Sequence, residues 1–176
     1  MKQEMKKFVH RSSLLTLLMT VMTFSISNTK NIYIQVSNEY IVLKYIEYRC
    51  QQESIPIKLV HNLIQRESNW RYPEKGQILG VKLVKSNKKA YGLMQLQLPT
   101  AIEMMEDNTL TEYDLMTNDV LNTDAGIRYL VWLREYYHGN MKLTLAAYNR
   151  GIKRVNNDLK IGKTPLNNYV HNILRY

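Results

Sequence analysis

The chain has 176 residues, a length that suits a single domain built around one core. Its one cysteine, Cys50, excludes an intramolecular disulfide, and its formal charge of +9 is spread along the sequence instead of forming the basic block typical of nucleic-acid-binding proteins. We therefore expect one domain, no nucleic-acid partner and at most a weak attraction for anionic polymers.

Residues 1–27 are typical of a secretory signal peptide. Four basic residues precede an apolar run over 14–26, and the small residues Ser25 and Ser27 occupy the positions that determine cleavage. The run is shorter than the ~20 residues of a membrane-spanning helix, so we expect cleavage after Ser27 and no stable membrane span. The leader carries a net +3, which leaves +6 on an exported mature chain in the periplasm or cell envelope. A leader retained as an anchor is the alternative.

A loose segment over 28–37 precedes a domain that is predicted to fill 38–176. The first helix is predicted over 40–52, where Ile41, Tyr45 and Tyr48 recur at helical spacing. Cys50 in this segment reads as a small buried apolar residue.

The second helix is predicted over 56–68, because a proline fits the first turn of a helix. It places Glu67 on one stripe with Val60, Leu63 and Ile64. A carboxylate on that stripe is poorly solvated and lies near the negative end of the helix dipole, and both effects disfavour the charged form. A raised pKa is what a general acid needs near neutral pH.

Helix position alone does not decide the role of Glu67. The alternative is a side chain that reaches solvent, or one that pairs with Arg66 or Lys89.

Residues 71–90 interrupt the helical pattern. Pro73, Gly76 and Gly80 break any helix there, and the segment ILGVKLV is compatible with a small β-hairpin. Because a loop of this length in a compact domain is commonly functional, we expect it to border a cleft.

The remaining sequence predicts further helices, so the fold class is mainly α. Thr100 and Glu103 form a capping-box pattern that opens a short helix. The longest periodic stretch covers 118–140 and ends at Gly139; shorter helices follow near 143–150 and 166–175. One face of the long helix carries Leu121, Ala125, Tyr129 and Trp132. We expect Tyr129, Leu130 and Trp132 to lie in the core.

Five short motifs occur in an order that resembles the soluble lytic transglycosylase family. They are ESNW (67–70), VKS (84–86), AYGLMQLQLPTA (90–101), NTDAGIRYL (122–130) and LAAYNRG (145–151). The resemblance covers roughly 40–172 and implies a lysozyme-like helical fold of the goose-type or SLT kind.

The resemblance implies that Glu67 is the sole catalytic carboxylate and that peptidoglycan is the substrate. Glu67 protonates the oxygen that joins N-acetylmuramic acid to N-acetylglucosamine, and then acts as base while the muramoyl 6-hydroxyl closes an anhydro ring. The N-acetyl group of the sugar replaces the second carboxylate of ordinary glycosidases. No cofactor is implied, and the four histidines lack the paired spacing of a metal site.

Other matching positions take roles from the same resemblance. Gly92 and Gln95 line the glycan cleft, with Leu93 and Met94 more typical of core, and Ser86 contacts an acetamide unless it is only an exposed loop serine.

Three further residues match late family positions. Tyr148 places its hydroxyl near the Glu67 carboxyl, orients it and favours its protonated form, while Asn149 fixes the following turn. Tyr169 faces the cleft, or is simply packed as an aromatic at helical spacing.

The sequence departs from the family pattern in two places. About ten extra residues lie near 71–82, so the family pattern does not define which residues form this edge of the cleft. Gln97 stands where the family often has an apolar methionine beneath the sugar.

Two other functions stay open. A goose-type hydrolase would need a second carboxylate, for which Glu74, Glu103 and Asp107 are the candidates. A non-catalytic cell-wall binder or assembly protein would need none. The compact size also suggests a partnership with a secretion or conjugation apparatus.

Overall fold

The computed structural model describes residues 38–70 and 89–175. Within these ranges the chain forms eight helices and one two-stranded sheet. The helices are α2 (Asn38–Gln52), α3 (Ile57–Ser68), α4 (Leu98–Met105), α5 (Glu112–Thr117), α6 (Asp119–Tyr136), α7 (Met141–Arg150), α8 (Ile152–Lys160) and α9 (Asn168–Leu174). The strands are β1 (Ala90–Tyr91) and β2 (Leu96–Gln97). The fold is mainly α, as the sequence predicted.

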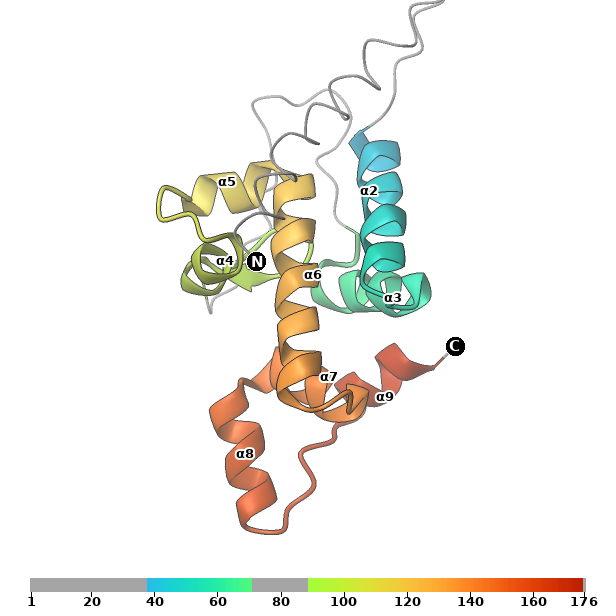
Figure 1. Ribbon diagram of the computed structural model, residues 1–176, viewed down its shortest axis with the longest axis vertical. Helices are drawn as coiled ribbons and strands as arrows, with labels where there is room; N and C mark the ends of the chain where they lie inside the picture. The colour runs from blue at the N-terminus through green and yellow to red at the C-terminus, as the bar shows by residue number, and fades with distance from the viewer. Residues whose placement is uncertain (1–37, 71–88, 176) are drawn as a thin grey trace, which may run out of the picture. The chain divides into compact units, whose positions relative to one another are not determined.

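Helix α6 is the central element, and other helices pack along it (Figure 1). Figure 1 shows α2 and α3 on one side of α6 and α4 and α5 on the other, with α7 and α9 at its C-terminal end. Apolar residues from most of these helices form one continuous core, and a smaller cluster lies beneath α4 and α5. Among the described residues, no helix has the length and apolarity needed to cross a bilayer.

Helix α2 buries a different face from the one that its sequence spacing predicted. Val42, Ile46 and Cys50 are buried, whereas Tyr48 is exposed. Burial raises the pKa of the Cys50 thiol to about 11, so this cysteine is the inert apolar residue that we expected.

A buried ion cluster joins α2 to α6 and explains that choice of face. Arg49 Nε lies 3.0 Å from Asp124 Oδ1, and Arg128 Nε lies 3.0 Å from Asp124 Oδ2. Arg49 also reaches Glu53 at 3.1 Å. A buried charge is costly unless it is paired, so α2 must turn Arg49, and with it Val42, toward α6.

Helix α4 begins two residues before the predicted cap. It starts at Leu98 with a proline in its first turn, and Gln97 at its N-cap makes no side-chain bond. The capping box occurs instead in α5, where the Thr111 hydroxyl and the Asp114 backbone and carboxylate satisfy each other.

Two other regions differ from the sequence prediction, and a third is not described. Helices α5 and α8 were not predicted. Leu130 is fully buried as expected, but Tyr129 is only partly buried and Trp132 is 37% exposed. The predicted leader, the segment 28–37, and most of the 71–90 insertion with its hairpin lie outside the described residues.

The observed sheet is short and lies just after that insertion. Ala90 pairs with Gln97 and Tyr91 pairs with Leu96 in antiparallel register. The turn between the two strands is the GLMQ sequence, which the sheet therefore holds against α6.

Candidate active site

Helix α3 carries Glu67 in its last turn. Pro56 caps the N-terminus, and Leu59, Val60, Leu63 and Ile64 are buried on the stripe that the sequence predicted. The helix ends at Asn69, which adopts the left-handed conformation with φ 57°. Burial of the stripe fixes the rotation of α3, and this rotation turns Glu67 inward.

The Glu67 carboxyl is partly buried and has few charged neighbours. Burial raises its pKa above that of an ordinary glutamate, while a hydrogen bond from Tyr169 and the charge of Arg66 oppose the rise. Among the described residues, no second carboxylate contributes to this shift. The net direction is upward because loss of water outweighs the two stabilising contacts.

Tyr169 supplies the hydrogen bond that the sequence assigned to Tyr148. The hydroxyl of Tyr169, a buried residue of α9, donates to Glu67 Oε1. A donor to a carboxylate stabilises the charged form, so the tyrosine orients the carboxyl but lowers its pKa. Tyr169 therefore opposes the rise in the Glu67 pKa, which burial causes.

Tyr148 lies close to this pair but bonds elsewhere. Its hydroxyl donates to the Met94 carbonyl at 2.9 Å. Burial raises the pKa of Tyr148 well above its usual value, and the charge of Glu67 raises it further. Tyr148 thus connects the GLMQ turn to the surroundings of Glu67.

Gly92 is required by packing within the protein. Its φ is +73°, and a Cβ there would lie 2.2 Å from Asn122 Nδ2 and 2.4 Å from the Leu115 carbonyl. The close neighbours that require a glycine at this position belong to α6 and to α5.

Asn122 is a positioning residue that sequence reasoning missed. Its Oδ1 accepts from the Met94 amide at 2.8 Å, and its Nδ2 donates to the carbonyls of Tyr91 at 2.9 Å and Leu115 at 3.1 Å. The available signal was the NTDAG motif, in which three consecutive polar residues interrupt a helix that is predicted to pack in the core, and Asn122, Thr123 and Asp124 are indeed buried.

Gln95 and Gln97 take different positions in the same turn. Gln95 is partly buried with φ +49°, and its Nε2 donates to the Gly92 carbonyl at 2.9 Å. Gln97 is exposed at the end of β2. The amide of Gln95 thus helps to shape the turn, while Gln97 faces solvent.

Asn149 connects α7 to the helix that carries Tyr169. It is exposed, and its Oδ1 accepts from Asn167 Nδ2 at 3.4 Å. Asn167 in turn caps α9 through the Val170 amide. Gly151 ends α7 with φ +80°. Ser86 lies outside the described residues.

Of the carboxylates considered for a hydrolase, the two that the structure describes, Glu103 and Asp107, do not contribute to the pKa shift of Glu67. Asp107 accepts from the amide and the hydroxyl of Thr109 at 2.9 and 2.6 Å, and these bonds lower its pKa. Glu103 is exposed on α4. Glu74 lies outside the described residues.

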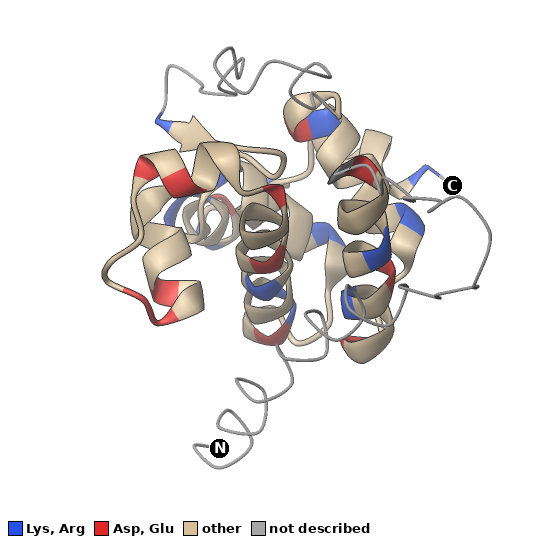
Figure 2. Cartoon of the chain, turned by 90° about the horizontal axis from the view of Figure 1, so that it is seen from above, with Lys and Arg blue, Asp and Glu red and all other residues tan. Residues whose placement is uncertain are grey.

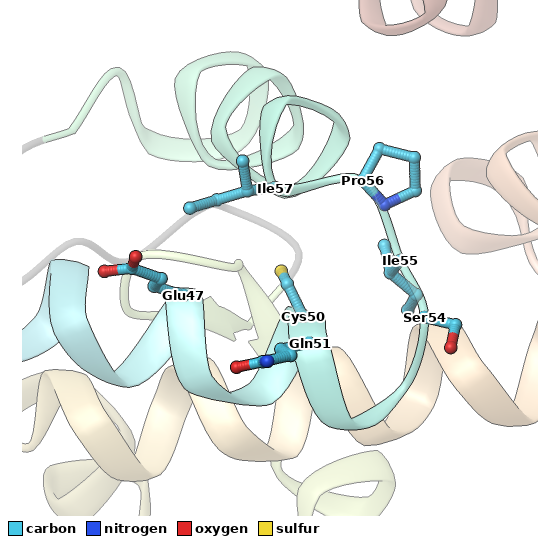
Figure 3. Close-up of a pocket in the computed structure, with 7 residues that line it drawn as sticks. All are labelled: Glu47, Cys50, Gln51, Ser54, Ile55, Pro56 and Ile57. Carbon is cyan, nitrogen blue, oxygen red and sulfur yellow. The ribbon is translucent and has the colours of Figure 1, made fainter.

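A surface hollow lies at the opposite end of α3 from Glu67. Figure 3 shows its lining at the turn between α2 and α3, with the Cys50 sulfur facing Ile57. Ten residues of helix separate Ile57 from Glu67, which corresponds to ~15 Å. This hollow is therefore separate from the candidate active site.

Comparisons with known proteins show that this fold is shared. The family model of the Transglycosylase SLT domain matches residues 44–170. Two similar solved structures are an inactive mutant of the lytic transglycosylase Slt from Pseudomonas aeruginosa (24% identity, TM-score 0.58) and the 70 kDa soluble lytic transglycosylase SLT70 from Escherichia coli (23% identity, TM-score 0.59). Each match covers 74% of this chain but 22% of the longer protein, and at this identity it shows a shared fold.

Proposed function

The chain belongs to the transglycosylase SLT domain family, and we propose that it is a lytic transglycosylase that cleaves the β-1,4 bond between N-acetylmuramic acid and N-acetylglucosamine in peptidoglycan. The observation that carries this proposal is the Glu67 carboxyl, which is partly removed from water, held by Tyr169 and raised in pKa. A larger fraction of such carboxyls is protonated near neutral pH, as a general acid requires.

The first step uses Glu67 as an acid. Its proton passes to the bridging oxygen as the bond from that oxygen to C1 of the muramoyl sugar breaks. The N-acetyl group of the same sugar supports the positive charge that develops at C1. Glu67 is left as a carboxylate, and the hydrogen bond from Tyr169 stabilises this form.

The second step returns the proton. The Glu67 carboxylate takes it from the 6-hydroxyl of the muramoyl sugar, and the freed oxygen bonds to C1. The product carries a 1,6-anhydro ring, Glu67 regains its proton, and no water is consumed. Burial favours the protonated form of Glu67, whereas Tyr169 and the charge of Arg66 favour the carboxylate, so both forms that the reaction needs have support in the site.

Two observations support a single-carboxylate mechanism. Among the described residues, Arg66 is the one charged group that shifts the pKa of Glu67. The similar Pseudomonas aeruginosa structure is an inactive mutant in which one glutamate is replaced by glutamine. An enzyme that acts on the cell wall must also be exported, and the predicted leader over 1–27 is consistent with that location.

The test is to identify the sugars that the protein releases from purified sacculi by mass spectrometry. We expect muramoyl ends that are one water lighter than hydrolysis products. Reducing muramic ends would overturn the proposal in favour of a goose-type hydrolase. Binding to sacculi without any released sugar would favour a non-catalytic wall protein.

A further inference from the structure

Three aromatic side chains lie in a row along α6. Tyr129 and Trp132 stack with ring centroids 6.1 Å apart and an interplanar angle of 17°, and Trp132 and Tyr136 stack at 5.8 Å and 30°. Residues three and four apart share one face of a helix. We call these three residues the aromatic strip.

The outer part of the aromatic strip is accessible to solvent. Trp132 is 37% exposed and Tyr136 is 45% exposed, whereas Tyr129 is only partly buried. Large aromatic rings that stay at the surface in a stacked row are unusual unless they bind something, because each exposed ring forgoes the free energy of burial.

The inner end of the strip reaches the candidate active site. The Tyr129 ring lies 5.3 Å from the Tyr148 ring, and Tyr148 is close enough to Glu67 for the charge of Glu67 to raise its pKa. A continuous series of aromatic rings therefore leads from the general acid to solvent.

Polar groups border the strip on neighbouring helices. The Tyr136 hydroxyl accepts from Asn156 Nδ2 of α8 at 2.8 Å, and Asn156 Oδ1 accepts from the Tyr137 hydroxyl at 3.0 Å. Burial raises the pKa of Tyr129, and the charge of Glu103 on α4 raises it further. Figure 1 shows α4 and α8 on the same side of α6.

This combination matches the surface of a sugar chain. A β-linked hexose has flat C–H faces that pack on aromatic rings and hydroxyls around its edge that bond to amides and carboxylates. We propose that the aromatic strip binds the glycan strand beyond the sugars next to Glu67. This inference rests on the proposed function, because it assigns an extended binding surface for the same substrate.

Binding is best measured with turnover removed. In a Glu67→Gln background, the full chain is titrated with peptidoglycan glycan strands of increasing length, from a tetrasaccharide upward, by calorimetry. Adding Trp132→Ala should weaken binding of long strands about tenfold, and the loss should grow with strand length. Trp132→Phe keeps a flat apolar ring and should recover most of the affinity.

Tyr113→Ala is the matched control, because Tyr113 is 66% exposed on α5 and lies outside the strip. It should leave affinity at every length unchanged. A loss from Trp132→Ala that is equal at all lengths, or the absence of any loss, would overturn the inference. So would an equal loss from Tyr113→Ala, or strip-dependent binding of a protein ligand without glycan binding.

The inference and the proposed function fail in different ways. Failure of the wild-type protein to form anhydro ends would remove the lytic reaction while leaving the binding result intact. Normal anhydro product with length-independent binding would remove the strip and leave the reaction.

Discussion

Asp124 is buried and Glu67 is partly buried, and the two carboxyls meet opposite surroundings. Asp124, in the junction of α2 and α6, lies between two arginines at 3.0 Å from each. Glu67, at the end of α3, has one tyrosine hydroxyl and the charge of the exposed Arg66. Burial alone therefore does not make a reactive acid; burial without a matching cation does.

The surrounding structure explains why the two regions differ. The α2–α6 junction places cations on both sides of Asp124, so its charge is compensated and stabilises the packing of the helices. The last turn of α3 instead places Glu67 where its own helix dipole is negative. The ionised form of Glu67 is therefore less well compensated than that of Asp124. Figure 2 shows the charged positions along these helices.

The largest expected effect is on catalysis. Glu67→Gln should lower the rate of anhydro-product formation at least about 10³-fold, because an amide is too weak an acid to protonate the bridging oxygen. The glutamine keeps the size of the side chain, so circular dichroism should not change. Glu47→Gln, which alters an exposed carboxylate paired with Lys44 on α2, is the control and should keep full activity. Retained activity in Glu67→Gln would contradict the assignment of Glu67, and not Asp124, as the reactive acid.

The second effect is on stability. Asp124→Ala should lower the free energy of unfolding by about 3 kcal/mol, because it leaves Arg49 buried beside an empty site. The quantity is measured by urea denaturation. Lys44→Ala removes an exposed ion pair and should cost less than about 0.5 kcal/mol. An equal loss of unfolding free energy in the two variants would show that burial does not make the Asp124 ion pairs more important for stability than an exposed pair.

The third effect separates the two tyrosines. Tyr169→Phe removes a donor to the carboxylate, so the pKa of Glu67 should rise and the alkaline limb of the pH–rate profile should move to higher pH. The rate should also fall about tenfold, because the carboxyl is no longer oriented. Tyr148→Phe removes a bond to the Met94 carbonyl and should leave the limb in place. A shift in Tyr148→Phe alone would reverse our assignment.

The smallest effect is on thermal stability, which the ionised Glu67 carboxylate lowers at neutral pH. Its folded pKa is raised, so wild-type stability is lost as pH rises from the unfolded value near 4.5 through the folded value. Glu67→Gln should therefore melt about 2 °C above wild type at neutral pH, with the difference vanishing below about pH 4. Calorimetry across this range tests the sign. A variant that melts lower at neutral pH would mean that the ionised carboxyl stabilises the fold.

Sequence periodicity predicted α3 and its inward glutamate because proline, buried spacing and helix length agree there. It could not predict α8, in which Val155 is the one buried residue, or α5, which is short and depends on a capping box. It identified residues that share a face, as for Trp132, but not whether another helix covers that face.

Sequence could not predict that Tyr169, and not Tyr148, donates to the Glu67 carboxyl. Tyr169 and Glu67 are 102 positions apart, and no local pattern reports which of two distant hydroxyls arrives at a carboxyl. The buried ion cluster was missed because Arg49 looks like any exposed basic residue in an amphipathic helix until its partner on α6 is known.

The Asn122 side chain has a consequence for anyone who wishes to transplant this site. Asn122 holds the Met94 amide, and the Met94 carbonyl in turn receives the Tyr148 hydroxyl. A graft that copies only the acid and its tyrosines into another scaffold would leave Tyr148 without its anchor. A graft must therefore include the GLMQ turn, the middle of α6 and the end of α7, because hydrogen bonds connect these three segments.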